Sequence, residues 1–378
     1  MKKNLFFAAL LLTATMFFAA CNKNDDVAPG SQQEAADLDY NAQNAKSWAN
    51  YMVQVGYLLQ QDATTLNDAW TKSYEGGKAF KEIFLNQQAL VCVEQIIDGC
   101  SNIANEVGTA KIGDPYDLYF SGKVTEALYA VESWYSWHSR DDYSNNIRSI
   151  RNAYFGTRDG RTIAEHSLAT IIANNNQALD TEVKDNIQGA INAILAIPDP
   201  FRNNIGAPEV QKAMTACANL QETLGKLKKY IQSTPTVNTD AVLHPILETY
   251  VNDVVLPTYS DLQQANTALY HAAQAFQQQP NNATFEACCN AWFEAREPWE
   301  SSEAFLFGPV DALGLDPNMD SWPLDQDAIV NILNSGKFDN LTWSDGDDDD
   351  EIEAVQSVRG FHTMEFLIFK DGKARRVN

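Results

Sequence analysis

Apolar residues recur along most of this chain at steps of three and four positions, which is the spacing of one face of an α-helix. Clear examples lie within residues 80–104 and 262–276. No convincing run shows the strict alternation of apolar and polar residues that is typical of half-buried strands. The pattern predicts an all-α protein, with helices over residues 40–61, 79–107, 123–138, 141–155, 180–196, 208–231, 243–278, 282–306 and 351–369.

A polar segment divides these predicted helices into two sets. Residues 233–240 are polar and include Pro235, so they predict a connection rather than a helix. We therefore expect residues 39–232 to form a first helical bundle and residues 240–378 to form a second. Two bundles packed along their sides would place a site between them.

The N-terminus has the features of a bacterial lipoprotein signal. Positive charge at residues 1–3 precedes the apolar residues 5–20, and Cys21 follows directly. The pattern predicts a signal peptide over residues 1–20 and lipidation of Cys21, with residues 21–38 as a flexible tether. A membrane-spanning anchor is disfavoured because the apolar run is shorter than the ~20 residues that such a helix needs. We therefore expect a protein of the cell envelope, held to the outer membrane by lipid.

The charge of the chain excludes one large class of partners. The formal net charge is −23 at pH 7, and removal of the signal peptide takes away Lys2 and Lys3 but no acid. Nucleic acid is not an expected partner, because phosphate binding needs a basic surface. An acidic envelope protein is compatible with binding of cations.

The most informative stretch lies near the C-terminus. In a helix over residues 360–369, His362 and Glu365 stand three positions apart and point the same way. Such a pair can hold a metal or pass a proton. The apolar residues around it would bury it, and buried polar groups need partners. By itself the pair is equally compatible with a structural contact that fixes packing.

A second unusual stripe lies about 60 residues earlier. On a helix, Trp292, Arg296, Trp299 and Glu303 share one face, so two aromatic rings flank a charged pair. The pair is either part of a functional site or a buried contact that fixes helix register. Asp325 precedes an apolar helical run, where N-capping alone would explain it.

Separated blocks in the second half resemble the imelysin family and its GxHxxE motif, here Gly360, His362 and Glu365. These blocks are residues 295–299, 302–305, 308–309, 321–325 and 360–367. In that family they normally precede a second helical bundle. Segments that resemble this second bundle come first here: residues 111–115, 132–136, 142–147 and 197–201. The resemblance therefore implies an imelysin-like fold of two helical bundles in circularly permuted order, which is tolerated when termini lie close together at the surface.

The resemblance also implies a site. Imelysin-like proteins are classed as candidate metallopeptidases of the M75 class, and relatives occur in envelope iron-uptake systems. The candidate metal ligands are His362, Glu365 and Glu303, with iron or zinc as the cofactor. The candidate ligand-contacting or supporting residues are Arg296, Asp325, Trp292, Ser133 and Gly360. From the other bundle, His138 is the first candidate ligand, although a partly exposed histidine at a helix end is the favoured interpretation. No catalytic residue is assigned.

Three functions remain open at this point. Binding of a metal or metal chelate in iron acquisition is favoured, with an uptake-system protein as a further expected partner. Peptide hydrolysis is less favoured, because His-Glu-x-x-His is absent and catalytic zinc usually has three protein ligands. The third is binding of an anionic or sugar ligand through Arg296 and the neighbouring tryptophans.

Overall fold

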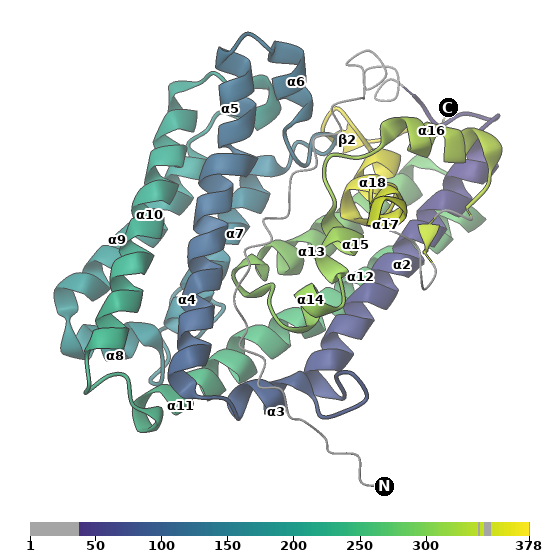
Figure 1. Cartoon of the computed structure of the whole chain (residues 1–378). Helices are drawn as coiled ribbons and strands as arrows, with labels where there is room; N and C mark the ends of the chain where they lie inside the picture. Colours follow the sequence, from purple (N-terminus) through teal and green to yellow (C-terminus); the bar gives the residue numbers. More distant parts are fainter. Residues whose placement is uncertain (1–37, 339–340, 344–348, 378) are drawn as a thin grey trace, which may run out of the picture.

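The computed structural model describes residues 38–338, 341–343 and 349–377, and most of these residues are helical (Figure 1). The all-α prediction is confirmed. The α-helices are α2 (Ala45–Thr71), α3 (Phe80–Leu85), α4 (Ala89–Glu106), α5 (Gly113–Phe120), α6 (Val124–Tyr129), α7 (Ser139–Phe155), α8 (Leu168–Asn175), α9 (Gln177–Leu195), α10 (Pro208–Ser233), α11 (Asp240–Thr249), α12 (Leu256–Gln278), α13 (Asn282–Glu300), α14 (Pro309–Ala312), α15 (Leu315–Asp320), α16 (Gln326–Ser335), α17 (Asp349–Gln356) and α18 (Gly360–Ile368). Short π-helical segments are η1 (Val107–Lys111) and η3 (Tyr250–Val255), and 3-10 turns are η2 (Phe201–Asn203) and η4 (Glu303–Phe305).

One small hairpin follows the last helix. Strands β1 (Phe369–Lys370) and β2 (Lys373–Ala374) pair antiparallel. The hairpin is anchored by Gly372, whose backbone N–H donates to the carbonyl of Tyr135 at 2.9 Å. Each strand has two residues, too few to show an alternating pattern in the sequence.

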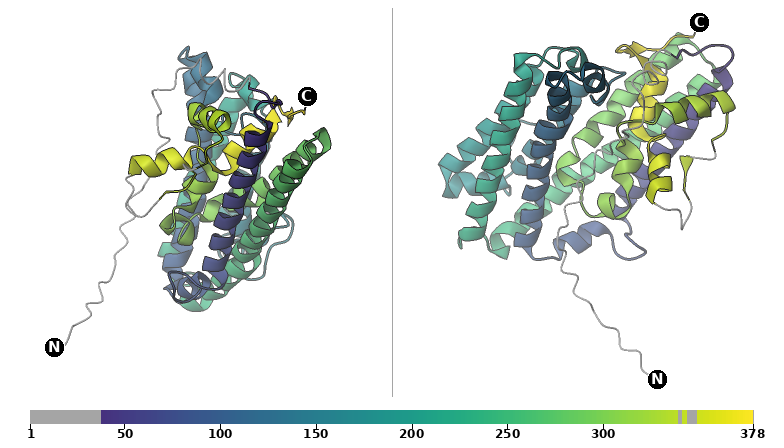
Figure 2. Two further views of the ribbon diagram at one scale, coloured as in Figure 1. Left: turned by 90° about the vertical axis from the view of Figure 1, so that its right-hand side faces the viewer. Right: turned by 45° about the horizontal axis from the view of Figure 1, so that its top comes forward.

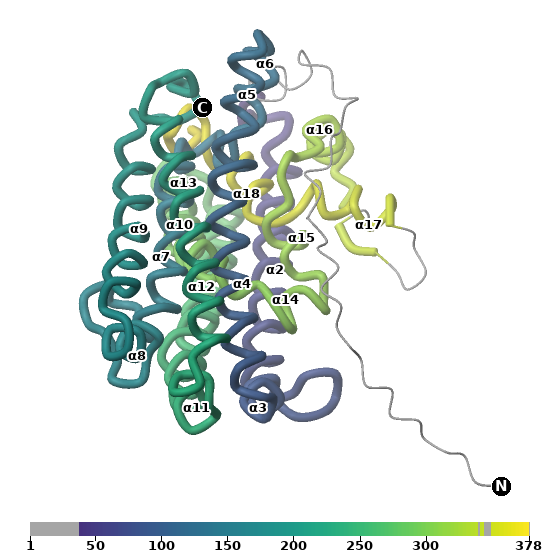
Figure 3. The backbone as a smooth tube through the Cα atoms, turned by 60° about the vertical axis from the view of Figure 1, so that its left-hand side comes forward, coloured from purple at the N-terminus to yellow at the C-terminus, as the bar shows by residue number. Residues whose placement is uncertain are grey.

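The long helices form two groups that lie side by side (Figures 1 and 2). In one group, α10 packs against α4 and α9, and α7 packs against α9. In the other, α12 packs against α2 and α13, and α18 packs against α2 and α13. Helix α13 also contacts α7, so it lies at the boundary between the groups (Figure 3).

This grouping differs at two points from the division expected at residues 233–240. Helix α2 belongs to residues 39–232 in sequence, yet it packs against α12 and α18. Helix α11 belongs to residues 240–378, yet it packs against α4. Hydrophobic periodicity shows which face of a helix is buried but does not identify the helix that covers this face. The sequence pattern therefore could not assign α2 or α11 to one of the two groups.

An irregular stretch of helix precedes Pro257. Pro257 lies in the first turn of α12, directly after the π-helical segment Tyr250–Val255. Proline lacks the N–H that would continue the helical bonds of the preceding turn. The chain therefore passes from α11 into α12 through a local change of helix type rather than a loop.

Aromatic side chains fix α18 against α2. The Trp48 Nε1–H donates to the carbonyl of Leu367 at 2.8 Å, and its ring stacks on Phe366 with centroids 6.2 Å apart. The Tyr51 hydroxyl donates to the carbonyl of Val358 at 2.6 Å, just before the helix. The helix that carries the GxHxxE motif is thus held rigidly within the second group.

No helix in the described part of the chain is long and apolar enough to span a membrane. The predicted signal peptide, Cys21 and nearly all of the tether fall within residues 1–37, outside the described residues. At the first described position, the carbonyl of Leu38 accepts a hydrogen bond from the Arg375 guanidinium at 2.5 Å. The first and last described residues therefore lie close together, which is the geometry that a circular permutation needs.

Candidate functional site

His362 and Glu365 lie on one face of α18 and contact each other, as their spacing predicts. The His362 Nδ1 is 3.1 Å from Glu365 Oε2, and both side chains are fully buried. The second carboxylate oxygen, Oε1, accepts hydrogen bonds from the backbone N–H groups of Tyr135 (3.0 Å) and Ser136 (2.7 Å). The Ser136 hydroxyl donates to the same oxygen at 2.7 Å. Glu365 therefore ties α18 to the segment between α6 and α7.

This contact explains why the helix predicted over residues 123–138 ends early. Helix α6 stops at Tyr129, and the backbone then takes positive φ values of 50° at Ser133 and 63° at Trp137. In this turn the N–H groups of Tyr135 and Ser136 bind Glu365 instead of helical carbonyls. The local sequence pattern is helical, but a buried carboxylate about 230 positions away determines the structure.

The other nitrogen of His362 faces a third helix. Its Nε2 is 3.2 Å from Oδ1 of Asp320, the last residue of α15, and 3.4 Å from the Arg296 guanidinium. Burial and the Arg296 charge both disfavour protonation, but hydrogen bonds to Asp320 and Glu365 outweigh them and raise the pKa of His362 to about 9. The imidazole is therefore protonated at neutral pH, and both nitrogens donate. In this state neither nitrogen has a lone pair for a metal.

Arg296 lies at the centre of the buried charges. Its Nε is 3.4 Å from Asp142, and its terminal nitrogens contact Glu300 (2.6 Å) and Asp320. The predicted acidic partner on the same helix face was Glu303, whereas the partner is Glu300, one turn after Arg296. Since its nitrogens already contact carboxylates and the side chain is fully buried, Arg296 has no free face for an anionic ligand. We call Asp142, Arg296, Glu300, Asp320, His362 and Glu365 the charge cluster.

Asp142 connects the charge cluster to the first helical group. It accepts from the hydroxyl of Ser133, and its Oδ1 is 2.8 Å from Nδ1 of His138. Burial opposes ionisation, but the charges of His138 and Arg296 lower the pKa of Asp142 to about 2. Ser133 and His138 therefore contact Asp142 and reach the rest of the charge cluster through it. His138 lies at the start of α7, where 22% of its side chain is exposed.

A group of carboxylates lies beside the charge cluster and shares two residues with it. Glu300, Glu303 and Asp320 each place an oxygen within 4.8 Å of the others. We call these three residues the acidic site. Burial raises the pKa of Glu303 well above its ordinary range and that of Glu300 to about 8. The Lys111 ammonium is 3.8 Å from Glu303 and 3.2 Å from Glu132.

Carboxyl groups outnumber basic groups in this interior. The acids are Asp142, Glu132, Glu300, Glu303, Asp320 and Glu365, and the bases are Lys111, His138, Arg296 and His362. Buried carboxylates without enough positive charge keep protons or take up a cation. The excess of acid is concentrated at the acidic site.

The remaining predicted residues have structural contacts. Trp292 is fully buried, and its Nε1–H donates to the carbonyl of Phe361 at 2.9 Å. Asp325 caps α16 by accepting from the N–H of Ala328 at 2.9 Å, which is the role that capping alone predicts. Neither residue contacts the acidic site. Glu303 joins the acidic site through Glu300 and Asp320 rather than through His362 and Glu365.

Gly360 permits the approach of α15 to α18. Its φ is +85°, and a Cβ at this position would lie 2.5 Å from the carbonyl oxygen of Met319, next to Asp320. We expect Gly360→Ala to lower the free energy of unfolding by about 2 kcal/mol, from backbone strain and this close contact.

Urea unfolding of the variant measures this loss. The matched control is Gly225→Ala in α10, where φ is ordinary and nothing lies within 4 Å of the added methyl group. Gly225→Ala should be neutral or slightly stabilising. Equal stability of Gly360→Ala and the wild-type protein would contradict the close approach described here.

Sequence reasoning missed four important side chains. Lys111 and Asp142 lie inside family-like segments, but nothing local distinguishes them from surface charges. Asp320 directly precedes the family-like residues 321–325 and follows no recognised spacing. The sequence could have identified Glu300 as the partner of Arg296, because it lies four positions after Arg296 on one helix.

The chain is similar in sequence and fold to known proteins. A family model described as Imelysin, for the M75 peptidases, matches residues 24–227 and 255–377. The crystal structure of an imelysin peptidase from Bacteroides ovatus has 56% sequence identity and a TM-score of 0.90, covering 91% of this chain and 100% of that chain. Iron-regulated protein A of Synechococcus elongatus is 34% identical over 128 residues, which are 34% of this chain and 32% of that protein. The chain thus matches about a third of this curated relative. The circular permutation stays a prediction.

Proposed function

Because this chain belongs to the imelysin family, we propose that it binds a metal cation of the iron class at the acidic site between its two helical groups. One observation carries the proposal: Glu300, Glu303 and Asp320 bring carboxylate oxygens within 4.8 Å of one another in a largely buried interior. A cation there would balance the excess of acidic groups. It would also replace the protons that the raised pKa values of Glu300 and Glu303 imply.

The donor set favours a hard cation. Three carboxylates supply only oxygen, which suits iron or manganese better than zinc, whose protein sites are mostly built from nitrogen and sulfur ligands. In this proposal His362 and Glu365 are not direct ligands. His362 orients Asp320 through its Nε2, and Glu365 orients His362 through its Nδ1.

The comparison with iron-regulated protein A supports iron rather than another hard cation, since that relative is named for its regulation by iron. We propose a role in iron acquisition at the cell envelope, with anchoring through lipid on Cys21. Free metal or a metal chelate is the expected ligand, and an uptake-system protein is the expected partner.

Glu303→Gln tests the site with the least damage to the fold. Glu303 forms an ion pair with Lys111 at 3.8 Å, and glutamine resembles the protonated carboxyl that burial favours. We expect the wild-type protein to bind about one Fe²⁺ per chain in anaerobic titration. The affinity should fall about 100-fold or more in Glu303→Gln, because even loss of a residue that only supports a ligand costs 10–100-fold.

The control is Glu222→Gln on the exposed face of α10, which makes the same change in charge. Its affinity for Fe²⁺ should equal that of the wild-type protein. Thermal melting without metal should show Glu303→Gln to be folded. Unchanged Fe²⁺ binding by folded Glu303→Gln would refute the proposed ligand set.

A further inference from the structure

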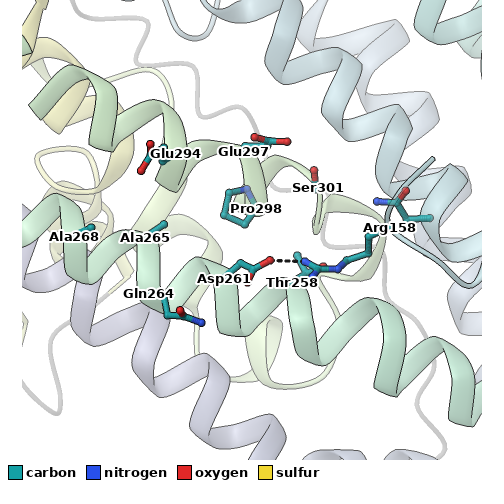
Figure 4. Close-up of a pocket in the computed structure, with 11 residues that line it drawn as sticks. Arg158, Thr258, Asp261, Gln264, Ala265, Ala268, Glu294, Glu297, Pro298 and Ser301 are labelled. Carbon is teal, nitrogen blue, oxygen red and sulfur yellow. Dashed lines mark hydrogen bonds and ion pairs between the residues drawn. The ribbon is translucent and has the colours of Figure 1, made fainter. Parts of the chain in front are cut away.

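A pocket lies on another face of α13. A pocket of about 440 Å³ opens between α12 and α13, a volume typical of small-molecule sites (Figure 4). From α13 it is lined by Glu294, Glu297 and Pro298, and Ser301 follows directly after the helix. Arg296 and Glu300 lie between these residues in sequence, and their side chains face the charge cluster. The pocket and the acidic site are therefore separate.

The pocket retains negative charge. Asp261, on α12, is neutralised by Arg158, whose guanidinium lies 2.6 Å away (Figure 4). Glu294 and Glu297 have no ion-pair partner among the described residues, and both are exposed at the mouth. A ligand with positive charge would therefore be favoured here.

The floor of the pocket offers buried polar groups. Asn152 is only 5% exposed, and its Oδ1 accepts from Arg151 at 3.2 Å, while its Nδ2 has no acceptor within the described residues. Thr258 is 1% exposed and donates to the carbonyl of Val254 at 2.7 Å, so its hydroxyl oxygen can still accept. The Asn152 amide nitrogen is therefore a donor that a ligand or a water molecule in the pocket can satisfy.

A proline interrupts the backbone hydrogen bonds of the helix beside the pocket. Pro298 lies inside α13 and has no N–H, so the carbonyl of Glu294 loses its usual helical donor. Beside it, Pro298, Ala265 and Ala268 form an apolar wall. The pocket therefore combines carboxylates with one amide donor and a small apolar surface.

We infer that this pocket binds a small hydroxylated amine, of which an amino sugar is the fitting class. The ammonium group donates to the carboxylates of Glu294 and Glu297. A ligand hydroxyl accepts from Asn152 Nδ2, and the carbon skeleton packs against Pro298 and Ala265. This binding is independent of the metal proposed for the acidic site.

Glucosamine is the probe, titrated into the protein by calorimetry at a pH where its amine is protonated. We expect saturable binding of one molecule per chain. Glu294→Gln and Glu297→Gln should each weaken it about tenfold or more, the loss expected for a charge-assisted hydrogen bond. Glucose has the same ring without the charge and should bind at least tenfold more weakly than glucosamine.

Glu286→Gln is the matched control, because Glu286 is an exposed acid on the same helix that does not line the pocket. Glucosamine affinity should be unchanged in this variant. Equal losses in Glu286→Gln and Glu297→Gln would overturn the proposal in favour of non-specific charge attraction. Equal affinity for glucose would overturn the assigned ligand class, and absence of saturable binding would overturn the site.

Discussion

Replacing Arg296 with methionine should lower the free energy of unfolding by about 3–5 kcal/mol, the typical cost of removing one partner from a buried ion pair. The guanidinium is fully buried and contacts Asp142, Glu300 and Asp320. Methionine fills part of the same volume, so little of the lost stability comes from a cavity. Most of the loss comes from the carboxylates that are left without a counter-charge. Urea unfolding at neutral pH measures it.

Two further variants separate the charge of Arg296 from its shape. Arg296→Lys keeps the charge but cannot contact three carboxylates at once, so we expect an intermediate loss. Arg158→Met removes an ion pair whose side chains are 33% and 54% exposed, and it should cost less than about 1 kcal/mol. Near-wild-type stability of Arg296→Met would contradict the central position of Arg296 in the charge cluster.

Stability of the metal-free protein should fall as the pH rises from about 6 to 9.5. The pKa of His362 rises from its ordinary 6.5 to about 9 on folding, so its contribution is complete below pH 6.5 and is lost as the pH passes 9. A shift of this size corresponds to about 3 kcal/mol. Glu300 acts in the same direction, because its pKa rises from 4.5 to about 8.

Asp142 has the opposite effect in acid. Its folded pKa of about 2 is below the ordinary 3.8, so its contribution is present above pH 3.8 and is lost as the pH falls towards 2. The groups together predict greatest stability in mildly acidic solution. Urea unfolding across this pH range measures the profile.

A histidine variant tests the assignment of the alkaline loss. His362→Gln should flatten the decline between pH 6.5 and 9, whereas His166→Gln, at an exposed position, should leave it unchanged. A wild-type profile that stays level to pH 9.5 would show that His362 is not held protonated by Asp320 and Glu365.

The sequence predicted contacts that depend on one helix and missed those that depend on packing between helices. The His362–Glu365 contact follows from spacing of three positions, and capping by Asp325 follows from its place before an apolar run. Spacing within one helix could not predict which carboxylates lie beside Glu303. Its neighbour Asp320 reaches the acidic site only because Gly360 lets α15 approach α18.

The segment between α6 and α7 shows the same limit. Its residues favour a helix, yet Tyr135 and Ser136 turn their N–H groups towards Glu365. A buried carboxylate needs donors, and here they come from a different helical group. The sequence therefore indicates the all-α fold and the GxHxxE helix, but not the residues that complete the site around it.

The most direct measurement of the central claim is anomalous X-ray scattering at the iron edge from crystals of the protein loaded with Fe²⁺ under anaerobic conditions. We predict one peak within coordination distance of carboxylate oxygens of Glu300, Glu303 and Asp320, with His362 still in contact with Glu365. A peak coordinated by the imidazole of His362 and by Glu365, or no ordered peak in the interior, would contradict the account.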